Sequence, residues 1–567
     1  MTKIIKCSIL WVMLVTLSLS AQQLHAKTAQ STPQCTLITK ITGYTPVVNS
    51  KKLKTFTWLA INSKGKIMGT GSHYDAKKLP EFKRCQQKNA HNQVMLPGLT
   101  DAHGHVLGLA KEISQVNLRG IESEQQTVAT VAKFAKENPQ LNWIQGRGWN
   151  QVLWKEKVFP TKKSLDAMLK NIPVVLRRVD GHAIWVNSKV LDIAKIDRNT
   201  RSPKGGEIVK DKNGEPTGVL IDNAMALVNQ HIPKPTAEQN QYALNKAFRL
   251  LLSLGITGVH DAGVSEWMYD FYKSRASSHT LPVRIYGMLS GDEKKLNQWL
   301  EDGIYKDADD YLSIRSVKLY ADGALGSRGA ALLKPYSDDP HNRGLILTQP
   351  DELFRLTKTI ISHGFQVNVH AIGDRGNRLV LDTYEKVFNL IGGQNLRNRI
   401  EHSQIVDLND IPRFKQLNVI ASMQPTHATS DMNMAADRLG KKRLKGAYAW
   451  RKFLDQGTIV ASGSDFPVEY ANAFYGLFSA ITRQDHHNQP KNGWLPDEKM
   501  TPTEALRSFT LDAAYAAFQE QDLGSLEIGK WADFILIDKD IISGEADAIW
   551  KTQVLETWIA GKKVYQK

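Results

Sequence analysis

Eight short apolar segments of this sequence share one feature, which is that each leads into polar or ionisable side chains. They are residues 96–100, 258–261, 283–288, 316–319, 366–370, 399–402, 419–424 and 458–465. Amphipathic stretches such as residues 236–254 lie between them, and this alternation of strands and helices is typical of α/β folds. We therefore predict a (β/α)8 barrel of the TIM type, whose active sites lie where the carboxyl ends of the strands meet.

The segments outside these strands predict two additions to the barrel. Residues 35–94 alternate short apolar runs with turns, and residues 534–537 and 553–564 have strand character again. We expect a composite β-sandwich domain from residues 27–95 and 505–567, beside a barrel over residues 96–504. Two further strand-like runs, 142–149 and 173–180, exceed the eight barrel strands and predict an inserted α+β subdomain, a lid, over about residues 140–240.

The first 26 residues resemble a secretory signal peptide. Lys3 and Lys6 precede an apolar run over residues 9–19, which is shorter than the roughly 20 residues that span a bilayer. Residues 24–26 offer a cleavage site and residues 20–21 an earlier one, and an uncleaved N-terminal anchor is the alternative. We therefore predict an exported, periplasmic protein without a stable membrane insertion.

Export bears on the cysteines and on the partners of this chain. Cys7 lies in the signal segment, so Cys35 and Cys85 remain as an even pair in an oxidising compartment. This arithmetic allows a disulfide between them, and two free thiols are the alternative.

The formal net charge of +16 falls to +14 without Lys3 and Lys6, and the lysines and arginines that carry it are scattered along the chain. Together with export, this argues against a nucleic-acid partner.

The first barrel strand leads into His103 and His105. On an extended chain both imidazoles point to the same side, where they can bind one cation. A single buried histidine is more often a core residue than a ligand. Side chains at the carboxyl ends of barrel strands, however, converge on one axis, so the joint pattern favours a metal site. The further candidate ligands at such ends are His370, His402 and Asp465.

Lys318 lies at another of these strand ends. A protonated lysine would be repelled by metal ions, whereas the carbamate that a neutral amine forms with carbon dioxide is an anionic ligand able to bridge two cations. Burial and nearby cations lower the pKa of a lysine and permit that reaction. An ordinary lysine in a salt bridge is the alternative.

In this order the six candidate ligands resemble the pattern of the amidohydrolase superfamily. The stretches 318–327, 370–374, 424–427, 464–468 and 524–527 narrow the resemblance to family 3, the branch that contains N-substituted formamide deformylase, and so do 146–149 and 180–183 of the insertion. The resemblance covers about residues 35–565. It implies a metal-dependent barrel hydrolase, usually with zinc, and in binuclear members a carboxylated lysine between two ions. Other divalent metals remain an alternative.

We therefore predict an exported amidohydrolase that cleaves a small N-substituted, non-peptide amide by means of a hydroxide formed at the metal. In the binuclear form, His103, His105 and Asp465 would hold one ion, and His370 and His402 the second, with Lys318 between them. Asp465 would move the proton from the water to the leaving amine. His427 would donate to the developing oxyanion, with a structural histidine as the alternative.

Two residues of the insertion, His182 and Trp149, are predicted to contact the substrate, and packing within a lid is the alternative. Ester, lactone or phosphotriester hydrolysis on the same metal site is a second functional hypothesis. A third is an exported solute-binding protein without turnover. The sequence also allows a homodimer.

Overall fold

The computed structural model describes residues 35–72, 76, 80–178, 183–203, 206–326 and 328–567. The predicted signal peptide over residues 1–26 and the candidate substrate residue His182 lie outside the described residues. Within those ranges, no helix combines the length and the hydropathy that crossing a bilayer requires.

Eight parallel strands form a nearly closed barrel, and they follow one another in the order of the sequence. They are β5 (Leu99–Gly104), β12 (Ile256–Val264), β13 (Arg284–Ser290), β15 (Leu312–Tyr320), β16 (Gln366–Ala371), β17 (Arg399–His402), β18 (Ile420–Met423) and β19 (Val460–Ser462). The short β14 (Tyr305–Lys306) is added antiparallel to β15. The chain just past β19 meets the end of β5, where the Asp465 amide donates to the His103 carbonyl at 2.7 Å. The predicted barrel is confirmed.

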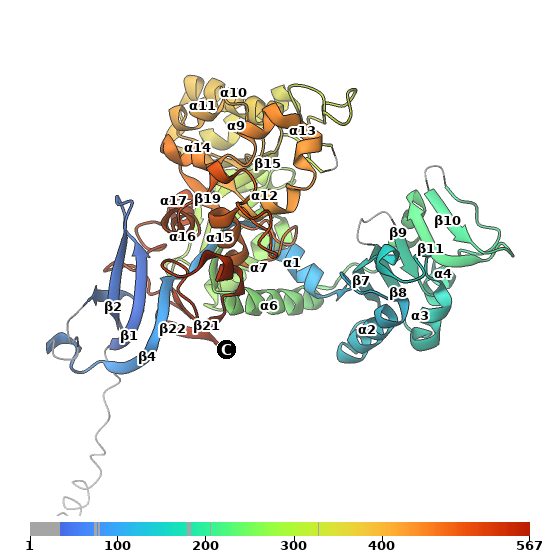
Figure 1. Ribbon diagram of the computed structural model, residues 1–567, viewed down its shortest axis with the longest axis horizontal. Helices are drawn as coiled ribbons and strands as arrows, with labels where there is room; N and C mark the ends of the chain where they lie inside the picture. Colours follow the sequence, from blue (N-terminus) through green and yellow to red (C-terminus); the bar gives the residue numbers. More distant parts are fainter. Residues whose placement is uncertain (1–34, 73–75, 77–79, 179–182, 204–205, 327) are drawn as a thin grey trace, which may run out of the picture.

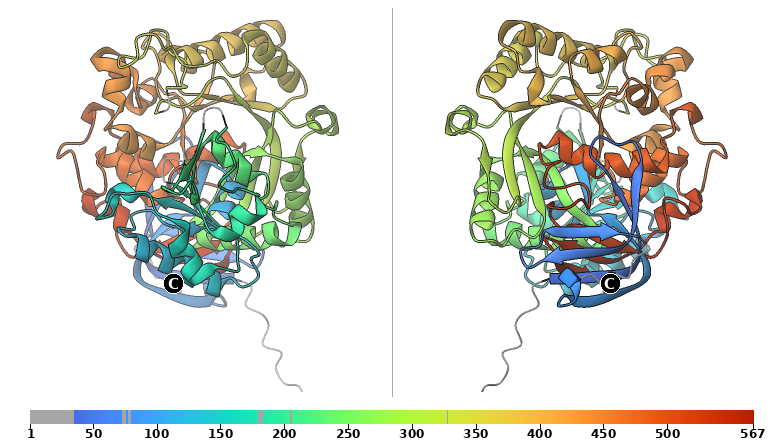
Figure 2. Two further views of the ribbon diagram at one scale, coloured as in Figure 1. Left: turned by 90° about the vertical axis from the view of Figure 1, so that its right-hand side faces the viewer. Right: turned by 90° about the vertical axis from the view of Figure 1, so that its left-hand side faces the viewer.

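Helices that follow the strands cover the outside of this barrel (Figure 2). They are α6 (Ala237–Ser253), α7 (Glu266–Ser277), α8 (Leu296–Asp302), α9 (Pro350–Ser362), α10 (Asp374–Ile391), α11 (Ile411–Gln416), α14 (Trp450–Asp455), α15 (Ala473–Thr482) and α16 (Pro502–Ser508). α6 illustrates why they form: Thr236 and Gln239 make a capping box at its start. Its apolar residues recur every three or four positions and are buried against the strands. Four further helices lie at the ends of strands or after them: α1 (Val106–Ile113), α12 (Pro425–Asp431), α13 (Ala435–Arg443) and α17 (Leu511–Ala516).

The two ends of the described chain form one seven-stranded sheet in the order β22-β21-β20-β4-β1-β2-β3. Its strands are β1 (Cys35–Pro46), β2 (Leu53–Asn62), β3 (Ile67–Gly71), β4 (Gln86–Pro97), β20 (Phe534–Ile537), β21 (Val554–Ile559) and β22 (Lys562–Gln566). The ends join where β4 pairs antiparallel with β20. A buried ion pair, in which Arg284 Nη2 donates to Asp533 Oδ1 at 3.0 Å, fastens this sheet to barrel strand β13. Strands from both ends of the described chain thus belong to one additional sheet beside the barrel.

The insertion has a six-stranded sheet of its own, in the order β10-β11-β9-β8-β7-β6. It projects from the side of the barrel in Figure 1 and lies in front of the ring of strands in the left view of Figure 2. Its sheet begins at β6, well before residue 140, because Val116 of this two-residue strand packs in the core of the insertion. The strands are β6 (Val116–Asn117), β7 (Ile144–Trp149), β8 (Val174–Arg178), β9 (Ala183–Val186), β10 (Gly206–Lys210) and β11 (Pro216–Asp222), with helices α2 (Glu124–Glu137), α3 (Lys162–Leu169), α4 (Ser188–Ile193) and α5 (Ala226–Asn229).

A disulfide joins Cys35 at the start of β1 to Cys85 just before β4. The two cysteines are 50 residues apart, and closing a loop of that size removes enough chain entropy from the unfolded state to be worth about 4 kcal/mol. We expect the Cys35→Ala/Cys85→Ala variant to melt several degrees below the wild type in a non-reducing buffer. Reductant should lower the melting temperature of the wild type alone. Equal melting temperatures for both proteins would contradict this prediction.

Candidate metal centre

The candidate ligands lie at the carboxyl ends of five different barrel strands, as the barrel geometry requires. His103 lies at the end of β5 and His105 directly follows that strand. Lys318 lies near the end of β15, His370 on β16 and His402 on β17, and Asp465 follows β19. Two of them, His402 with φ of 78° and Asp465 with φ of 60°, adopt a left-handed backbone conformation. Residues other than glycine rarely adopt it, and such strain is concentrated at functional sites.

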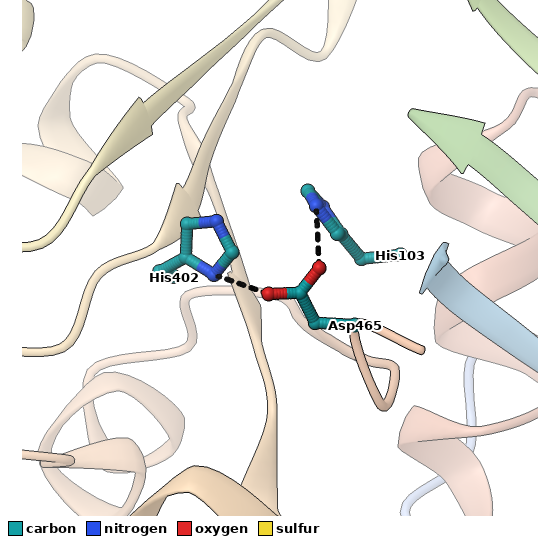
Figure 3. A group of neighbouring side chains, drawn as sticks. All are labelled: His103, His402 and Asp465. Atoms are coloured by element: carbon teal, nitrogen blue, oxygen red, sulfur yellow. Dashed lines mark ion pairs between the residues drawn. The ribbon is translucent and has the colours of Figure 1, made fainter. Parts of the chain in front are cut away.

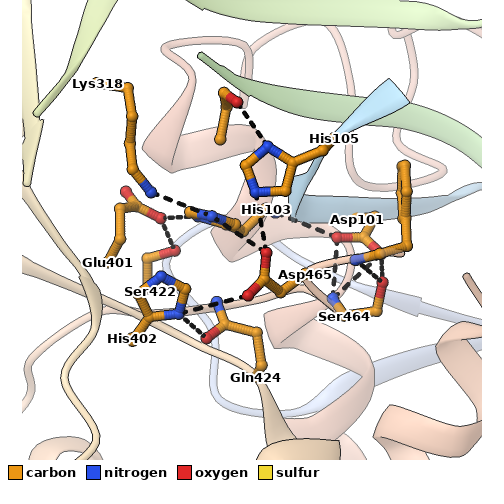
Figure 4. Close-up of polar contacts among 12 residues, drawn as sticks. Asp101, His103, His105, Lys318, Glu401, His402, Ser422, Gln424, Ser464 and Asp465 are labelled. Atoms are coloured by element: carbon orange, nitrogen blue, oxygen red, sulfur yellow. Dashed lines mark hydrogen bonds and ion pairs between the residues drawn. The ribbon is translucent and has the colours of Figure 1, made fainter. Parts of the chain in front are cut away.

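The carboxylate of Asp465 is the centre of the group (Figures 3 and 4). Its Oδ1 lies 3.1 Å from His105 Nε2 and 3.7 Å from His103 Nε2. Its Oδ2 lies 4.0 Å from His402 Nδ1. Ligand atoms of His103, His402 and Asp465 lie within 4.8 Å of one another, a spacing at which one metal ion can contact all three.

The hydrogen bonds around His105 indicate why a cation fits here. His105 Nδ1 lies 2.7 Å from the carbonyl of Ala262, so in a neutral ring the proton is on Nδ1. The Nε2 lone pair of the neutral ring then faces Asp465 Oδ1, a buried atom that has no hydrogen-bond donor among the residues that the structure describes. Two acceptors in contact require a positive charge between them. A proton on His105 Nε2 can supply that positive charge. Asp465 therefore raises the pKa of His105, and this effect exceeds the lowering by burial.

The electrostatics of Asp465 keep it ionised. Burial raises the pKa of its carboxyl. The facing His105 and His103 lower that pKa by more than burial raises it, and the result is a pKa of about 2. At neutral pH this side chain is therefore an anion that can bind a cation or accept a proton.

Lys318 reaches the same group from β15. Its Nζ lies 3.2 Å from His103 Nε2, and the residue is 1% exposed. Burial lowers the pKa of Lys318 to about 8, against the opposing effect of Glu401 and Asp465. A large fraction of this amine is therefore neutral near pH 8, which is the form that reacts with carbon dioxide.

His370 and His402 form the other half of the group. Their ring centroids are 4.6 Å apart, and the His402 ring is 4.8 Å from that of His103. His402 Nδ1 lies 2.8 Å from Gln424 Oε1, which places its proton on Nδ1 and leaves Nε2 free to bind a metal. Burial, with the charge of Lys318, lowers the pKa of His370 to about 3, so that this ring is neutral at physiological pH. All six candidate ligands therefore come together.

The predicted catalytic residue His427, on α12, is also part of the group. Its Nε2 lies 3.8 Å from Asp465 Oδ2, and this buried atom has no hydrogen-bond partner among the described residues. Its Nδ1 lies 2.9 Å from Gln404 Nε2, an amide donor. Because Nδ1 accepts, the proton of a neutral His427 is on Nε2 and is directed toward the site.

The structure corrects the prediction for Trp149. Its ring is fully buried in the core of the insertion, with its centroid about 6 Å from those of Trp154 and Trp185. Its Nε1 donates to the Leu176 carbonyl at 2.8 Å. Trp149 is therefore a packing residue of the insertion, because a side chain that is enclosed on all sides presents no surface to a substrate.

Three charged residues that support the site were not predicted as members of it. Asp101 is one of them, and its carboxylate accepts from the His103 amide at 3.1 Å and from the Ser464 hydroxyl at 2.6 Å. It thereby holds the end of β5 against the loop that carries Asp465. The others, Arg399 and Glu401, are adjacent inward-facing residues of β17. Two charged residues within one strand that was predicted to lie in the barrel were the available signal, because such residues are seldom buried unless they are paired.

Comparison with known proteins gives consistent similarities. The model of the amidohydrolase family matches residues 88–565. The Bacillus subtilis protein YtcJ, whose name assigns it to the amidohydrolases, is 31% identical over 512 residues, which are 89% of this chain and 95% of that protein. N-substituted formamide deformylase of Arthrobacter pascens is 26% identical over 526 residues, or 88% of this chain and 93% of that protein. The solved structure of an uncharacterized metal-dependent hydrolase from Pyrococcus furiosus is 27% identical with a TM-score of 0.73, covering 90% of this chain and 100% of that one.

Proposed function

This chain belongs to the amidohydrolase family, and from that premise we propose that it hydrolyses the carbon–nitrogen bond of small N-substituted amides. Membership makes it a metal-dependent hydrolase that acts on bonds other than peptide bonds. The observation that carries the proposal is the convergence of the His103 and His105 Nε2 atoms on the ionised carboxylate of Asp465. A binding protein without turnover has no need of such a proton acceptor.

We infer that the metal is zinc, because imidazole nitrogens and carboxylate oxygens suit zinc. We infer two ions per chain, because the six candidate ligands are more than one four-coordinate zinc would use. His103, His105 and Asp465 would hold one ion and His370 and His402 the other, with Lys318 between them. When bound, the ions supply a polarised substrate carbonyl and a water molecule that loses its proton near neutral pH.

The residues of the chain then have separate tasks. Asp465 takes a proton from the attacking water, whose oxygen bonds to the carbonyl carbon. His427 donates through Nε2 to the oxygen on which negative charge develops. Asp465 passes its proton to the amide nitrogen as the carbon–nitrogen bond breaks. The products are a carboxylic acid and an amine.

The test is a panel of N-substituted formamides and acetamides, each beside the ester of the same acyl group. We expect turnover of the amides, with kcat/KM greater for them than for the matched esters. A preference for the esters would favour the alternative ester or lactone hydrolase. Tight binding of amides without any turnover by the zinc-loaded protein would favour a solute-binding protein.

We also propose that the Nζ of Lys318 carries a carboxyl group. The neutral amine adds carbon dioxide, a nitrogen–carbon bond forms, and one proton is released. With a pKa near 8, roughly half of the amine is neutral at pH 8 and only about 1% at pH 6. We therefore expect apo protein to regain zinc and activity faster at pH 8 than at pH 6, and bicarbonate to accelerate this at pH 8.

The control for that prediction is Lys318→Ala, which should take up at most one ion per chain and show no response to bicarbonate. If the wild type regains two ions per chain at pH 8 in buffer freed of carbon dioxide, Lys318 is not carboxylated.

We further propose that residues 1–26 direct export to the periplasm. The Cys35–Cys85 disulfide supports this, because disulfides persist in oxidising compartments. We expect the mature protein, recovered from the periplasmic fraction, to begin near Lys27 by intact-mass measurement. A full-length chain in the cytosolic fraction would contradict the proposal.

A further inference from the structure

Arg399 and Glu401 place an ion pair inside the barrel, where TIM barrels normally carry branched apolar side chains. Both residues are fully buried. Arg399 Nε lies 2.7 Å from Glu401 Oε1, and Arg399 Nη2 donates to Glu401 Oε2 at 2.9 Å. Burying two charges has a large desolvation cost, so the pair calls for an explanation beyond the stability of the fold.

The surroundings of Glu401 indicate why the ion pair is buried. Besides Arg399, its Oε2 accepts from the Ser422 hydroxyl of β18 at 2.6 Å. The same oxygen makes a short hydrogen bond with His103 Nδ1 of β5 (Figure 4). The carboxylate of β17 is thus held by donors from two other strands, and one of these donors is a predicted metal ligand.

Arg399 fixes the orientation of this carboxylate. Its Nη2 donates to the Ala102 carbonyl at 2.7 Å, one residue before His103. Its Nη1 donates to His260 Nδ1 of β12 at 2.9 Å. Since the guanidinium is planar and anchored on β5 and β12, it leaves the Glu401 carboxylate little freedom to rotate away from the imidazole.

We propose that Glu401 is a positioning residue of the metal site, which accepts the Nδ1 proton of His103 and so makes Nε2 the metal-binding atom. An ionised carboxylate only accepts hydrogen bonds, so the neutral ring must carry its proton on Nδ1. Nε2 is then bare, on the side of Asp465 Oδ1 at 3.7 Å. Arg399 acts through Glu401 by orienting it. The inference rests on the metal site of the proposed function, and it does not depend on which bond is hydrolysed.

The competing explanation is that Glu401 only neutralises Arg399. Replacing Glu401 alone would leave a buried arginine without its partner, which by itself strongly destabilises a folded protein. Two charge-neutral double variants avoid this. Arg399→Met/Glu401→Gln keeps an amide oxygen that can accept from His103 Nδ1, whereas Arg399→Met/Glu401→Met removes the acceptor.

Zinc affinity of the two double variants, measured by competition with a chromogenic chelator, tests the proposal. We expect the methionine variant to bind zinc about 10- to 100-fold more weakly than the glutamine variant, with similar melting temperatures of the two apo proteins. The absorption spectrum of bound Co²⁺ should change in the methionine variant as well, because the imidazole is free to turn. Equal zinc affinities and identical Co²⁺ spectra would overturn the proposal.

A measurement on the wild type keeps the proposal testable if either double variant fails to fold. In a crystal structure of the zinc-loaded enzyme, we expect His103 Nε2 at about 2.0–2.1 Å from zinc and Glu401 still in contact with Nδ1. A carboxylate of Glu401 bound directly to the ion, or a His103 ring that binds through Nδ1, would overturn it. Failure of amide hydrolysis with this geometry intact would count against the proposed function alone.

Discussion

Replacement of Asp465 by asparagine is expected to lower kcat/KM for the amide substrate by about 10²- to 10⁴-fold. The asparagine amide has nearly the same shape and retains an oxygen that can face the metal, but it cannot take a proton from water at any relevant pH. The ionised state of Asp465 in the wild type, with a pKa of about 2, makes it available for that task. The measurement is steady-state kinetics on zinc-loaded protein, with the metal content of each preparation determined in parallel.

Asp512→Asn is the matched control. Asp512 is a buried carboxyl of α17 that pairs with Arg507 Nε at 2.9 Å, near the starts of β18 and β19 at the opposite end of the barrel. Its replacement should leave kcat/KM unchanged. If Asp465→Asn keeps more than about a tenth of the wild-type activity at full metal occupancy, Asp465 is not the proton carrier.

Removal of both β5 histidines, in His103→Ala/His105→Ala, is expected to eliminate one metal ion per chain and to reduce hydrolysis to background. Two of the three nitrogen and oxygen donors around that ion would be lost, and Asp465 alone cannot replace them. Metal binding also stabilises the folded state by mass action, by about 4 kcal/mol at a metal concentration 1,000 times its Kd. Zinc should therefore raise the melting temperature of the apo wild type by several degrees, and that of the variant by much less.

His279→Ala serves as the control for this experiment, because His279 is exposed and lies beside Asp309, which is outside the group of candidate ligands. That variant should bind and respond to zinc as the wild type does. Wild-type zinc content in the double variant would show that β5 supplies no ligand, and the assignment of the metal centre would then be wrong.

The barrel and the composite sheet were predictable because both depend on local patterns. Apolar runs of strand length leading into polar side chains mark strands whose carboxyl ends meet, whatever the loops between them. The strand character of both ends of the chain indicated their pairing, which β4 and β20 provide. The start of the insertion was not predictable, since β6 has two residues and so carries no periodic signal. Its assignment depends on packing against Val128 and Val131 of α2.

The residues of the site were likewise predictable only in part from the sequence. The sequence by itself determined which donors stand at strand ends, and therefore that His103, His105, Lys318, His370, His402 and Asp465 converge. It did not determine that Trp149 faces its own core, because an aromatic residue in a strand has the same pattern whether it lines a pocket or fills an interior. Trp149 is buried because it packs in the core of the insertion, where Trp154 and Trp185 are among its neighbours.

Only the tertiary structure decided which nitrogen is free in three of the candidate ligands, His103, His105 and His402. That choice depends on single acceptors: Ala262 for His105, Glu401 for His103 and Gln424 for His402. For the two β5 histidines the acceptor comes from far along the chain, and Glu401 is 298 residues from His103. Residue type and periodicity specify the strand and the face on which a side chain lies. They carry no information about which hydrogen-bond partner the closed barrel brings opposite that side chain. For a histidine, this partner determines which ring nitrogen carries the proton, and the other ring nitrogen is then left to bind the metal.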